Sequence, residues 1–300
     1  MDDDLQEVLR MLSQQKKDTP QDLSLEQQRS AFEEGGLAMP LPDEPHDIVS
    51  VSLGDIPCMK ITPKAATAGK AILYFHGGGY VVGSSLSHRH LMARIAIDAG
   101  VTLWSVDYRL APEHAFPASV DDGLAAFSGL CRIENLSPAD IVVAGDSAGG
   151  GLAMSLILAL RDAGDALPAG SVLLSPWLDL TASTKSYVSR ASSDPMLTKE
   201  QLLYFAGLYQ GSSQAAGPSL SPIHSDLAGL PQLYVQVGDK EILLDDSHLI
   251  ATRALGHGVS ARIDVYPDMF HVFQYFWPML PQAREAIKRL GGEIQRMLLK

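Results

Sequence analysis

The sequence is poor in cysteine and in positive charge, and it has no long hydrophobic run. Its 300 residues include only 2 cysteines, too few for a disulfide framework or a cysteine-rich metal cluster. Lys and Arg number 23 against 35 Asp and Glu, and a net charge of −12 repels the phosphate backbone of nucleic acid. The longest uncharged apolar stretch, residues 147–160, is shorter than the roughly 20 residues that span a bilayer. We therefore predict no nucleic-acid partner and no membrane partner.

The composition is that of a globular enzyme. Hydrophobic residues make up 46% and charged residues 19%, so a sizeable core can form and wholesale disorder is excluded. No linker-like break interrupts the apolar segments, which favours one large α/β domain with a small accessory part over two domains. The N-terminus, Met1-Asp2-Asp3-Asp4, is acidic where a secretory signal is basic, and no apolar segment follows it. The sequence therefore predicts a soluble cytoplasmic protein.

Strand and helix patterns alternate along most of the chain. Strands are predicted near 47–53, 56–62, 71–75, 101–107, 141–145, 171–176, 232–238 and 261–266. Helices are predicted near 86–99, 119–131, 147–163 and 244–256. No crossover helix fits between the first two strands, so they are expected to pair antiparallel. The later alternation of strands with helices predicts a largely parallel sheet.

Two helices are predicted to precede the sheet. Apolar residues recur at helical spacing in the first helix and form a face that must cover another part of the protein: Leu5, Val8, Leu9 and Leu12. The second helix is expected to start at Ser24, where Gln27 completes a capping box, and to end at the Gly35-Gly36 pair.

Residues 180–231 form one long connection that breaks the alternation. Thr198 and Gln201 have the spacing of a capping box before an apolar helical pattern, so an inserted helix is predicted there. Insertions of this length are often lids, and the alternative is an inert surface excursion. The predicted division of the chain is a small helical cap in two parts, 1–45 and 181–230, and an α/β core in two parts, 46–180 and 231–300.

The segment 145–149, Gly-Asp-Ser-Ala-Gly, lies between an apolar strand pattern and an apolar helix pattern. Glycines two residues before and after Ser147 allow a strained turn that lifts the hydroxyl clear of the sheet, beside the N-terminus of the helix. This arrangement is a nucleophile elbow, and it predicts covalent acyl chemistry. An accidental glycine-rich loop is the alternative, but the strand before and the helix after favour the elbow.

A serine nucleophile requires a histidine base oriented by a carboxylate, and in α/β-hydrolases both follow the serine in the chain. His271 is favoured as the base because it follows the last predicted strand, at the sheet edge where chemistry gathers. His257 precedes that strand, at the opposite edge, and His248 lies within a predicted helix. His224 belongs to the insertion.

The acid should follow the preceding strand, and two carboxylates compete for that role. Asp239 and Glu241 both come directly after the strand pattern of residues 232–238. Spacing alone does not choose between them. Asp245 and Asp246 follow one turn later, where a carboxylate favours the N-terminus of the next helix.

Acyl transfer also requires hydrogen-bond donors for the tetrahedral oxyanion. One is normally the backbone N–H after the nucleophile, here that of Ala148, and the others come from the loop after the third strand. That loop begins with residues 76–79, His-Gly-Gly-Gly, so Gly78 and Gly79 are predicted donors and His76 a structural anchor. A phosphate loop is the alternative, but the glycine spacing fits neither Gly-x-Gly-x-x-Gly nor Walker A.

The pair His88 and His90 is the only close histidine pair. Residues two apart on a helix do not share a face, so joint metal ligation is not expected. The sequence predicts no metal and no cofactor.

Three blocks of this sequence resemble the bacterial esterases of the hormone-sensitive-lipase-like family, within the α/β-hydrolases. Residues 76–79 and 145–150 are similar to the two signatures of that family, and residues 107–117 are similar to its characteristic stretch between them. Three such blocks in order are highly specific, and the resemblance runs from about residue 47 to the end. It implies an α/β-hydrolase fold, with a mostly parallel eight-stranded sheet flanked by helices and a small helical cap.

The resemblance also implies site residues. The family's acid heads a segment that matches residues 241–246, which implies Glu241 as the acid. Aspartate is commoner there and the family's proline is missing, so Asp239 stays the alternative. His271 matches the family's His-Gly-Phe-type site, with Val272 in place of glycine.

The function implied is that of a serine carboxylesterase acting on short- to medium-chain acyl esters through Ser147, Glu241 and His271. The implied partner is a small-molecule ester, and the family is frequently dimeric, which predicts a homodimer. An amidase or deacetylase with the same triad is one alternative. A non-catalytic small-molecule receptor is the other, since plant gibberellin receptors resemble this family but have lost the histidine, and the presence of His271 argues against it.

Overall fold

The computed structural model describes residues 3–18, 20, 22–213, 217 and 220–299, and its centre is an eight-stranded sheet. The strands are β1 (His46–Leu53), β2 (Ile56–Pro63), β3 (Ala71–Phe75), β4 (Thr102–Val106), β5 (Ile141–Asp146), β6 (Gly170–Leu174), β7 (Gln232–Gly238) and β8 (Ala261–Tyr266). Their order in the sheet is β1-β2-β4-β3-β5-β6-β7-β8. The pair β1–β2 is antiparallel and the pairs from β3 to β8 are parallel, as the sequence predicted. The pair β2–β4 is also antiparallel, which the sequence did not predict.

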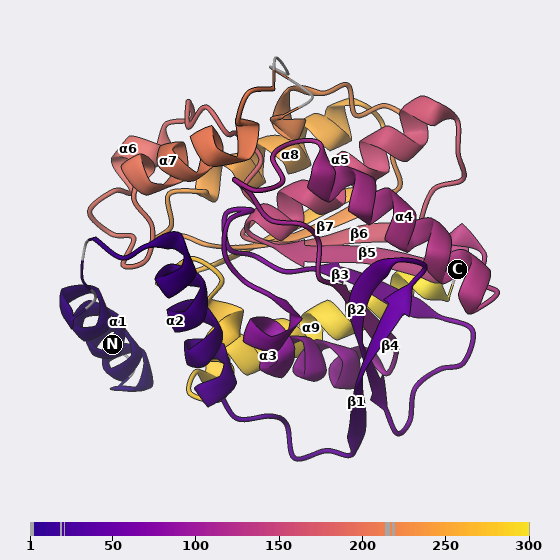
Figure 1. Ribbon diagram of the computed structural model, residues 1–300, viewed down its shortest axis with the longest axis horizontal. Helices are drawn as coiled ribbons and strands as arrows, with labels where there is room; N and C mark the ends of the chain where they lie inside the picture. Colours follow the sequence, from indigo (N-terminus) through magenta and orange to yellow (C-terminus); the bar gives the residue numbers. More distant parts are fainter. Residues whose placement is uncertain (1–2, 19, 21, 214–216, 218–219, 300) are drawn as a thin grey trace.

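Helices cover both faces of the sheet. The helices are α1 (Asp3–Asp18), α2 (Leu25–Ala38), α3 (Ser85–Ala99), α4 (Ala118–Ile133), α5 (Ala148–Ala163), α6 (Ser186–Ser189), α7 (Lys199–Gln210), α8 (Leu244–Gly256) and α9 (Pro281–Leu298). Figure 1 shows α3 and α9 below the sheet and α4, α5 and α8 above it. The structure is therefore an α/β-hydrolase fold with helices flanking a mostly parallel sheet.

Side-chain alternation on the central strands divides the core into two clusters. On β3, Leu73 and Phe75 belong to the cluster that includes α4 and α5, whereas Ile72 and Tyr74 belong to the cluster that includes α3 and α9. Successive strand residues point to opposite faces, and β3 is buried along its whole length because both faces carry helices. This burial fixes the end of β3, and with it the position of the glycine loop that follows.

The two N-terminal helices form as expected, with one correction. Ser24 and Gln27 make the reciprocal capping box of α2. The prediction that Gly35-Gly36 ends this helix is wrong, because α2 continues to Ala38. A Cβ at Gly36 would clash with the backbone of Ser87, so this glycine permits a close approach of α2 to α3.

The apolar face of α1 covers the segment that contains His271. Leu5, Val8 and Leu12 are buried in a third cluster, which includes Phe270 and Phe273 on either side of that histidine. The N-terminal helix therefore lies against one of the loops at the carboxyl edge of the sheet.

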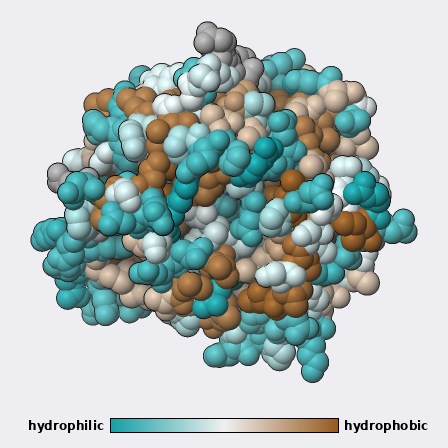
Figure 2. Space-filling model, in the orientation of Figure 1, coloured by the Kyte–Doolittle hydropathy of each residue, from teal (hydrophilic) through white to brown (hydrophobic). Residues whose placement is uncertain are grey.

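The insertion between β6 and β7 contains α7, as predicted, and Thr198 accepts a hydrogen bond from the amide of Gln201 at its start. Figure 1 shows α6 and α7 at the same end of the molecule as α2. None of the helices in the described ranges combines the length and apolarity that a membrane span requires. On the face drawn in Figure 2, hydrophobic patches are small and mixed with hydrophilic residues.

Candidate active site

Ser147 occupies the sharp turn between β5 and α5. Its φ of 51° and ψ of −122° lie outside the regions that L-residues favour, so the turn is strained. Its amide donates to the carbonyl of Leu174, which ties the turn to the end of β6. A Cβ at Gly149 would clash with the carbonyl oxygen of Phe75, so the approach of α5 to β3 requires glycine there. This is the strand, turn and helix arrangement that the pentapeptide predicts.

His271 and Glu241 form a buried pair at the same edge of the sheet. Nδ1 of His271 lies 2.9 Å from Oε2 of Glu241, and the side chains are 5% and 0% exposed. An ionised carboxylate only accepts hydrogen bonds, so Nδ1 carries the proton and Nε2 is the basic nitrogen. Burial lowers the pKa of His271, but the hydrogen bond and the charge of Glu241 outweigh it and hold the pKa above its ordinary value.

The other oxygen of Glu241 is also fully engaged. Oε1 accepts hydrogen bonds from the amide of Gly238 at 2.6 Å and from the hydroxyl of Ser175 at 2.8 Å. Asp194, from the insertion, accepts a hydrogen bond from the amide of Ile242 at 2.9 Å and so holds the residue next to Glu241. The sequence gives no signal for Ser175 or Asp194, because neither belongs to a motif and both contacts join distant parts of the chain.

Asp239, the alternative acid, has different partners. Its Oδ1 accepts a hydrogen bond from the amide of Asp268 at 2.7 Å, and its Oδ2 lies 3.3 Å from Nζ of Lys240. Its side chain is 29% exposed, whereas that of Glu241 is fully buried against His271. The structure therefore brings Glu241, and not Asp239, together with His271.

The remaining carboxylates of this region support the start of α8, as expected. Asp245 and Asp246 both lie in its first turn. They also accept hydrogen bonds from outside the helix: Asp245 from the amide of Ser186, and Asp246 from the amides of Leu178 and Asp179. These contacts fasten the beginning of the insertion to α8.

The other downstream histidines lie away from the pair, as predicted. His248 is exposed on α8, and His257 follows the last residue of that helix. His224 is exposed in the insertion, with Nε2 3.8 Å from Oδ1 of Asp179.

The glycine loop after β3 presents backbone groups beside the elbow. Gly78 and Gly79 have φ values of 117° and 63°, which favour glycine. The carbonyl of Gly78 accepts hydrogen bonds from the amides of Val81 and Val82. Within the described part of the chain, no protein acceptor takes a hydrogen bond from the amides of Gly78 or Gly79. His76 is buried and its Nδ1 lies 2.8 Å from the carbonyl oxygen of Gly77, in agreement with a role as loop anchor.

Asp146 joins the glycine loop to the elbow. Its Oδ1 accepts hydrogen bonds from the hydroxyl of Tyr74 at 2.8 Å and from the amide of Gly77 at 3.1 Å, and its Oδ2 lies 3.4 Å from Nε2 of His88. Burial alone raises the pKa of this carboxyl, but His88 and the hydrogen bonds outweigh it and hold the pKa below its ordinary value. The motif alone does not indicate this role of Asp146.

The insertion covers the glycine loop. The ring of Phe205, on α7, lies against Gly79 so closely that a Cβ there would clash with it. Tyr209, one turn further along α7, stacks on Tyr80 with the ring centroids 3.8 Å apart. These contacts place α7 over the residues that follow β3.

The histidine pair on α3 turns to separate partners. His90 has Nε2 2.8 Å from the carbonyl oxygen of Tyr275, while His88 faces Asp146. Among the residues that the structure describes, no group of three or more His, Cys, Asp or Glu side chains is placed to hold a metal ion.

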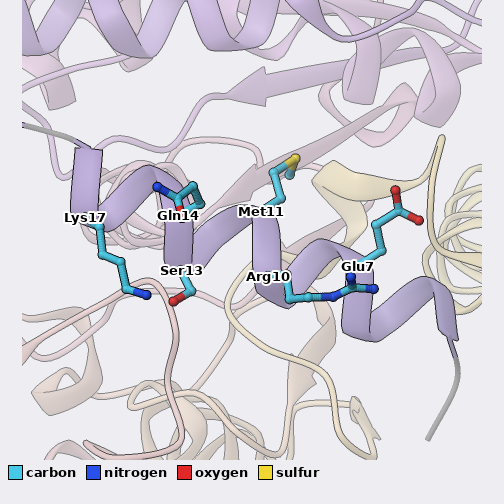
Figure 3. Close-up of a pocket in the computed structure, with 6 residues that line it drawn as sticks. All are labelled: Glu7, Arg10, Met11, Ser13, Gln14 and Lys17. Carbon is cyan, nitrogen blue, oxygen red and sulfur yellow. The ribbon is translucent and has the colours of Figure 1, made fainter.

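A hollow of about 470 Å³ lies along one face of α1, away from these groups. Figure 3 shows the side chains that line it, all from that single helix: Glu7, Arg10, Met11, Ser13, Gln14 and Lys17. Ser147, Glu241 and His271 are not part of its lining, so this hollow is not part of the candidate active site.

The fold and the geometry of the site define a hydrolase of the α/β class, and comparisons with known proteins agree. The family described as having the alpha/beta hydrolase fold matches residues 72–275. An acetyl-hydrolase of Streptomyces hygroscopicus is 38% identical over 91% of this chain and 88% of its own length. An esterase of Acinetobacter venetianus is 37% identical over 74% of this chain and 73% of its own length.

A solved structure is similar along nearly the whole chain. The crystal structure of an esterase from the bacterial hormone-sensitive lipase family superposes with a TM-score of 0.95, at 39% identity, and 99% of each chain is covered. The present chain belongs to this family of α/β-hydrolase esterases and is a carboxylic ester hydrolase. These relatives favour the enzyme over the non-catalytic receptor.

Proposed function

We propose that the protein hydrolyses short- to medium-chain acyl esters with Ser147 as nucleophile, His271 as base and Glu241 as the acid that orients the base. The observation that carries this proposal is the fully buried contact of 2.9 Å between Nδ1 of His271 and Oε2 of Glu241. Support for the nucleophile comes from the strained turn at Ser147. Two consecutive residues at the sheet edge support the proximity of the nucleophile and the base. The carbonyl of Leu174 accepts a hydrogen bond from the amide of Ser147. The hydroxyl of Ser175 accepts one from the amide of Val272, the residue after His271.

In the proposed mechanism, Nε2 of His271 takes the proton of the Ser147 hydroxyl while Oγ of Ser147 attacks the ester carbonyl carbon. The negative charge that develops on the carbonyl oxygen is stabilised by the amides of Gly78, Gly79 and Ala148. The protonated imidazole then donates its proton to the leaving alcohol, and an acyl-enzyme forms on Ser147. Water, deprotonated by the same nitrogen, attacks the acyl carbon. The protonated imidazole then returns its proton to the oxygen of Ser147 as the carboxylic acid is released.

The substrate range belongs to the same proposal. The close contact of Phe205 with Gly79 leaves little room beside the proposed oxyanion donors and so favours short acyl groups. The relative named an acetyl-hydrolase favours an acetyl or similarly short acyl group and leaves open whether the leaving group is an alcohol or an amine. A deacetylase is therefore the second candidate function.

Three single variants test the triad with a series of p-nitrophenyl esters of increasing acyl length. Ser147→Ala should lower kcat on the order of 10⁴-fold or more, leaving only the rate supplied by binding and the oxyanion donors. Glu241→Ala should lower kcat by roughly 10³- to 10⁴-fold, because the imidazole loses its orienting partner. Asp239→Ala is the matched control and should keep kcat within about threefold of the original, since a partly exposed ion pair contributes little.

Two results would overturn the proposal. A Ser147→Ala protein that keeps most of its activity rules out the serine mechanism, and a larger loss in Asp239→Ala than in Glu241→Ala reverses the assignment of the acid. An acyl p-nitroanilide series run beside the esters distinguishes the second candidate, which requires turnover of amides at a comparable rate.

We also propose that the protein is a cytoplasmic homodimer. β8 is the last strand of the sheet, and among the described residues no strand pairs with its outer edge. Val265 on that strand and Leu255 on the neighbouring α8 are exposed, at 37% and 59%, and such an edge with apolar side chains supports pairing between copies.

The free cysteines, Cys58 and Cys131, support a reducing compartment. Cys58 is buried and Cys131 is half-buried.

A further inference from the structure

Ser175 lies directly after β6, at the point where the proposed acid and the histidine segment meet. Its side chain is completely buried. Its φ of 44° is in the left-handed region that favours glycine, so a serine there is strained. The strain and the burial of this polar residue at the edge of the site indicate that its hydroxyl has a function.

The hydroxyl of Ser175 has two partners, which come from different loops. It donates a hydrogen bond to Oε1 of Glu241 at 2.8 Å and accepts one from the amide of Val272 at 3.1 Å. Val272 follows His271 and has a φ of 46°, so the backbone beside the imidazole is also strained. One oxygen atom therefore fixes both the carboxylate and the chain that carries the histidine.

The backbone of the same segment completes the connection to the nucleophile. The amide of Ser175 donates to the carbonyl of Gln236 on β7, and the carbonyl of Leu174 accepts a hydrogen bond from the amide of Ser147. Residues 174 and 175 thus contact the elbow, the strand before the acid and the segment of the histidine.

We propose that Ser175 is a positioning residue for ester hydrolysis, which holds Glu241 in line with Nδ1 of His271 and fixes the histidine loop through Val272. The inference rests on the proposed function of Glu241 and His271. The hydrogen bond from the hydroxyl to Oε1 leaves Oε2 as the oxygen that faces the imidazole. The bond to Val272 prevents rotation of the loop, and small displacements of a catalytic base lower the rate steeply.

The main test is Ser175→Gly, compared with Ser175→Ala. Glycine accepts a φ of 44° without strain, and this relief offsets part of the loss of the two buried hydrogen bonds, so the variant should still fold while it lacks the hydroxyl. We expect kcat to fall roughly 10- to 100-fold, the loss that corresponds to one hydrogen bond to a carboxylate and one neutral hydrogen bond, with KM within about twofold of the original. Ser175→Ala should lose a similar factor in kcat.

Ser171→Ala is the matched control. Ser171 lies on β6 and is completely buried, and within the described residues its hydroxyl has no hydrogen-bond partner. Its removal should leave kcat and KM unchanged within about twofold, because no buried partner loses a hydrogen bond. An equal fall of kcat in this control would show that any cavity in β6 lowers activity and would overturn the specific role of Ser175.

A double-mutant cycle with Glu241→Ala separates positioning from a general structural effect. If Ser175 acts through the acid and the base, Ser175→Gly should cost at least threefold less in the Glu241→Ala background than in the original protein. An equal cost in both backgrounds, or an unchanged kcat in Ser175→Gly alone, overturns the inference. A Glu241→Ala protein of nearly full activity overturns the proposed triad instead, so the two failures are distinguishable.

Discussion

The aromatic ring of Phe205 packs against the α-carbon of Gly79. A Cβ at Gly79 would clash with that ring, and the backbone at Gly79 has a φ of 63°. Gly79 is one of the proposed oxyanion donors. Two features require glycine at this position: its backbone conformation and the aromatic side chain that packs against it. The contact also joins the insertion to the chemistry, because Phe205 comes from α7 and Gly79 from the loop after β3.

We predict that Phe205→Ala widens the acyl range of the enzyme. Removal of the ring opens space beside Gly79, and each additional methylene that is buried contributes about 0.8 kcal/mol. The ratio of kcat/KM for an eight-carbon ester to that for a four-carbon ester should rise on the order of 10-fold or more. The measurement is a p-nitrophenyl ester series with both proteins at one pH.

Tyr204→Ala is the control for this prediction. Tyr204 is the preceding residue on the same helix and is 53% exposed, so its removal tests the helix surface without opening the contact at Gly79. The acyl-length ratio should stay unchanged there. An identical ratio in Phe205→Ala and in the original protein would show that the ring does not limit the acyl group.

The dependence of activity on pH should reveal the contact between His271 and Glu241. The base acts in its neutral form, so kcat/KM should fall as the pH drops through the pKa of His271, which lies above the ordinary histidine value. In Glu241→Gln the negative charge that accepts the hydrogen bond of His271 is gone. Burial then dominates, and the pKa of His271 should fall. The acidic limb of the profile should then move to lower pH, while kcat falls by several orders of magnitude.

Asp239→Asn provides the comparison for the pH profile. Its carboxylate bonds to the amide of Asp268 and lies beside Lys240, and it makes no hydrogen bond to His271 among the described residues. The acidic limb should keep its position in this variant. A limb that moves in Asp239→Asn and not in Glu241→Gln would contradict the assignment of Glu241 as the partner of the base.

The sequence predicts most of the fold and two members of the proposed triad because their signals are local. Ser147 and His271 each follow a recognisable strand pattern, and the order of those strands places them at one edge. Asp239 and Glu241 could not be separated in the same way, since they share one short loop. The difference lies in burial and partners, which only the folded chain determines: Asp239 bonds to Asp268, and Glu241 to His271.

Two helices that contain adjacent glycines differ from the sequence prediction. The pair Gly35-Gly36 was expected to end a helix, and α9, which contains Gly291 and Gly292, was not predicted. In both helices a glycine allows close packing on α3: Gly36 lies against the backbone of Ser87, and Gly291 against that of Asp98. Tertiary contact here outweighs the low intrinsic helix propensity of glycine.

The contacts of Ser175 and Asp146 could not be predicted from the sequence either, because their partners are distant in sequence.

The buried carboxylate of Asp146 holds the glycine loop. Asp146→Ala leaves the hydroxyl of Tyr74 and the amide of Gly77 without an acceptor, and it removes the anion beside His88. Breaking such a buried network should lower the free energy of unfolding by about 3 kcal/mol. It should also lower kcat on the order of 10-fold or more, because the loop that carries the proposed oxyanion donors is no longer fixed.

Asp146→Asn and Asp140→Ala complete this test. The amide oxygen of asparagine can still accept from Tyr74 and Gly77, so Asp146→Asn should keep more of both stability and kcat than Asp146→Ala. Asp140 forms a partly exposed ion pair with Lys70, and its removal should cost less than about 1 kcal/mol. Urea unfolding with a parallel kcat measurement distinguishes the cases. If Asp146→Ala is as stable and as active as Asp140→Ala, the carboxylate at 146 does not support the loop, and the proposed oxyanion donors are fixed by the glycine backbone alone.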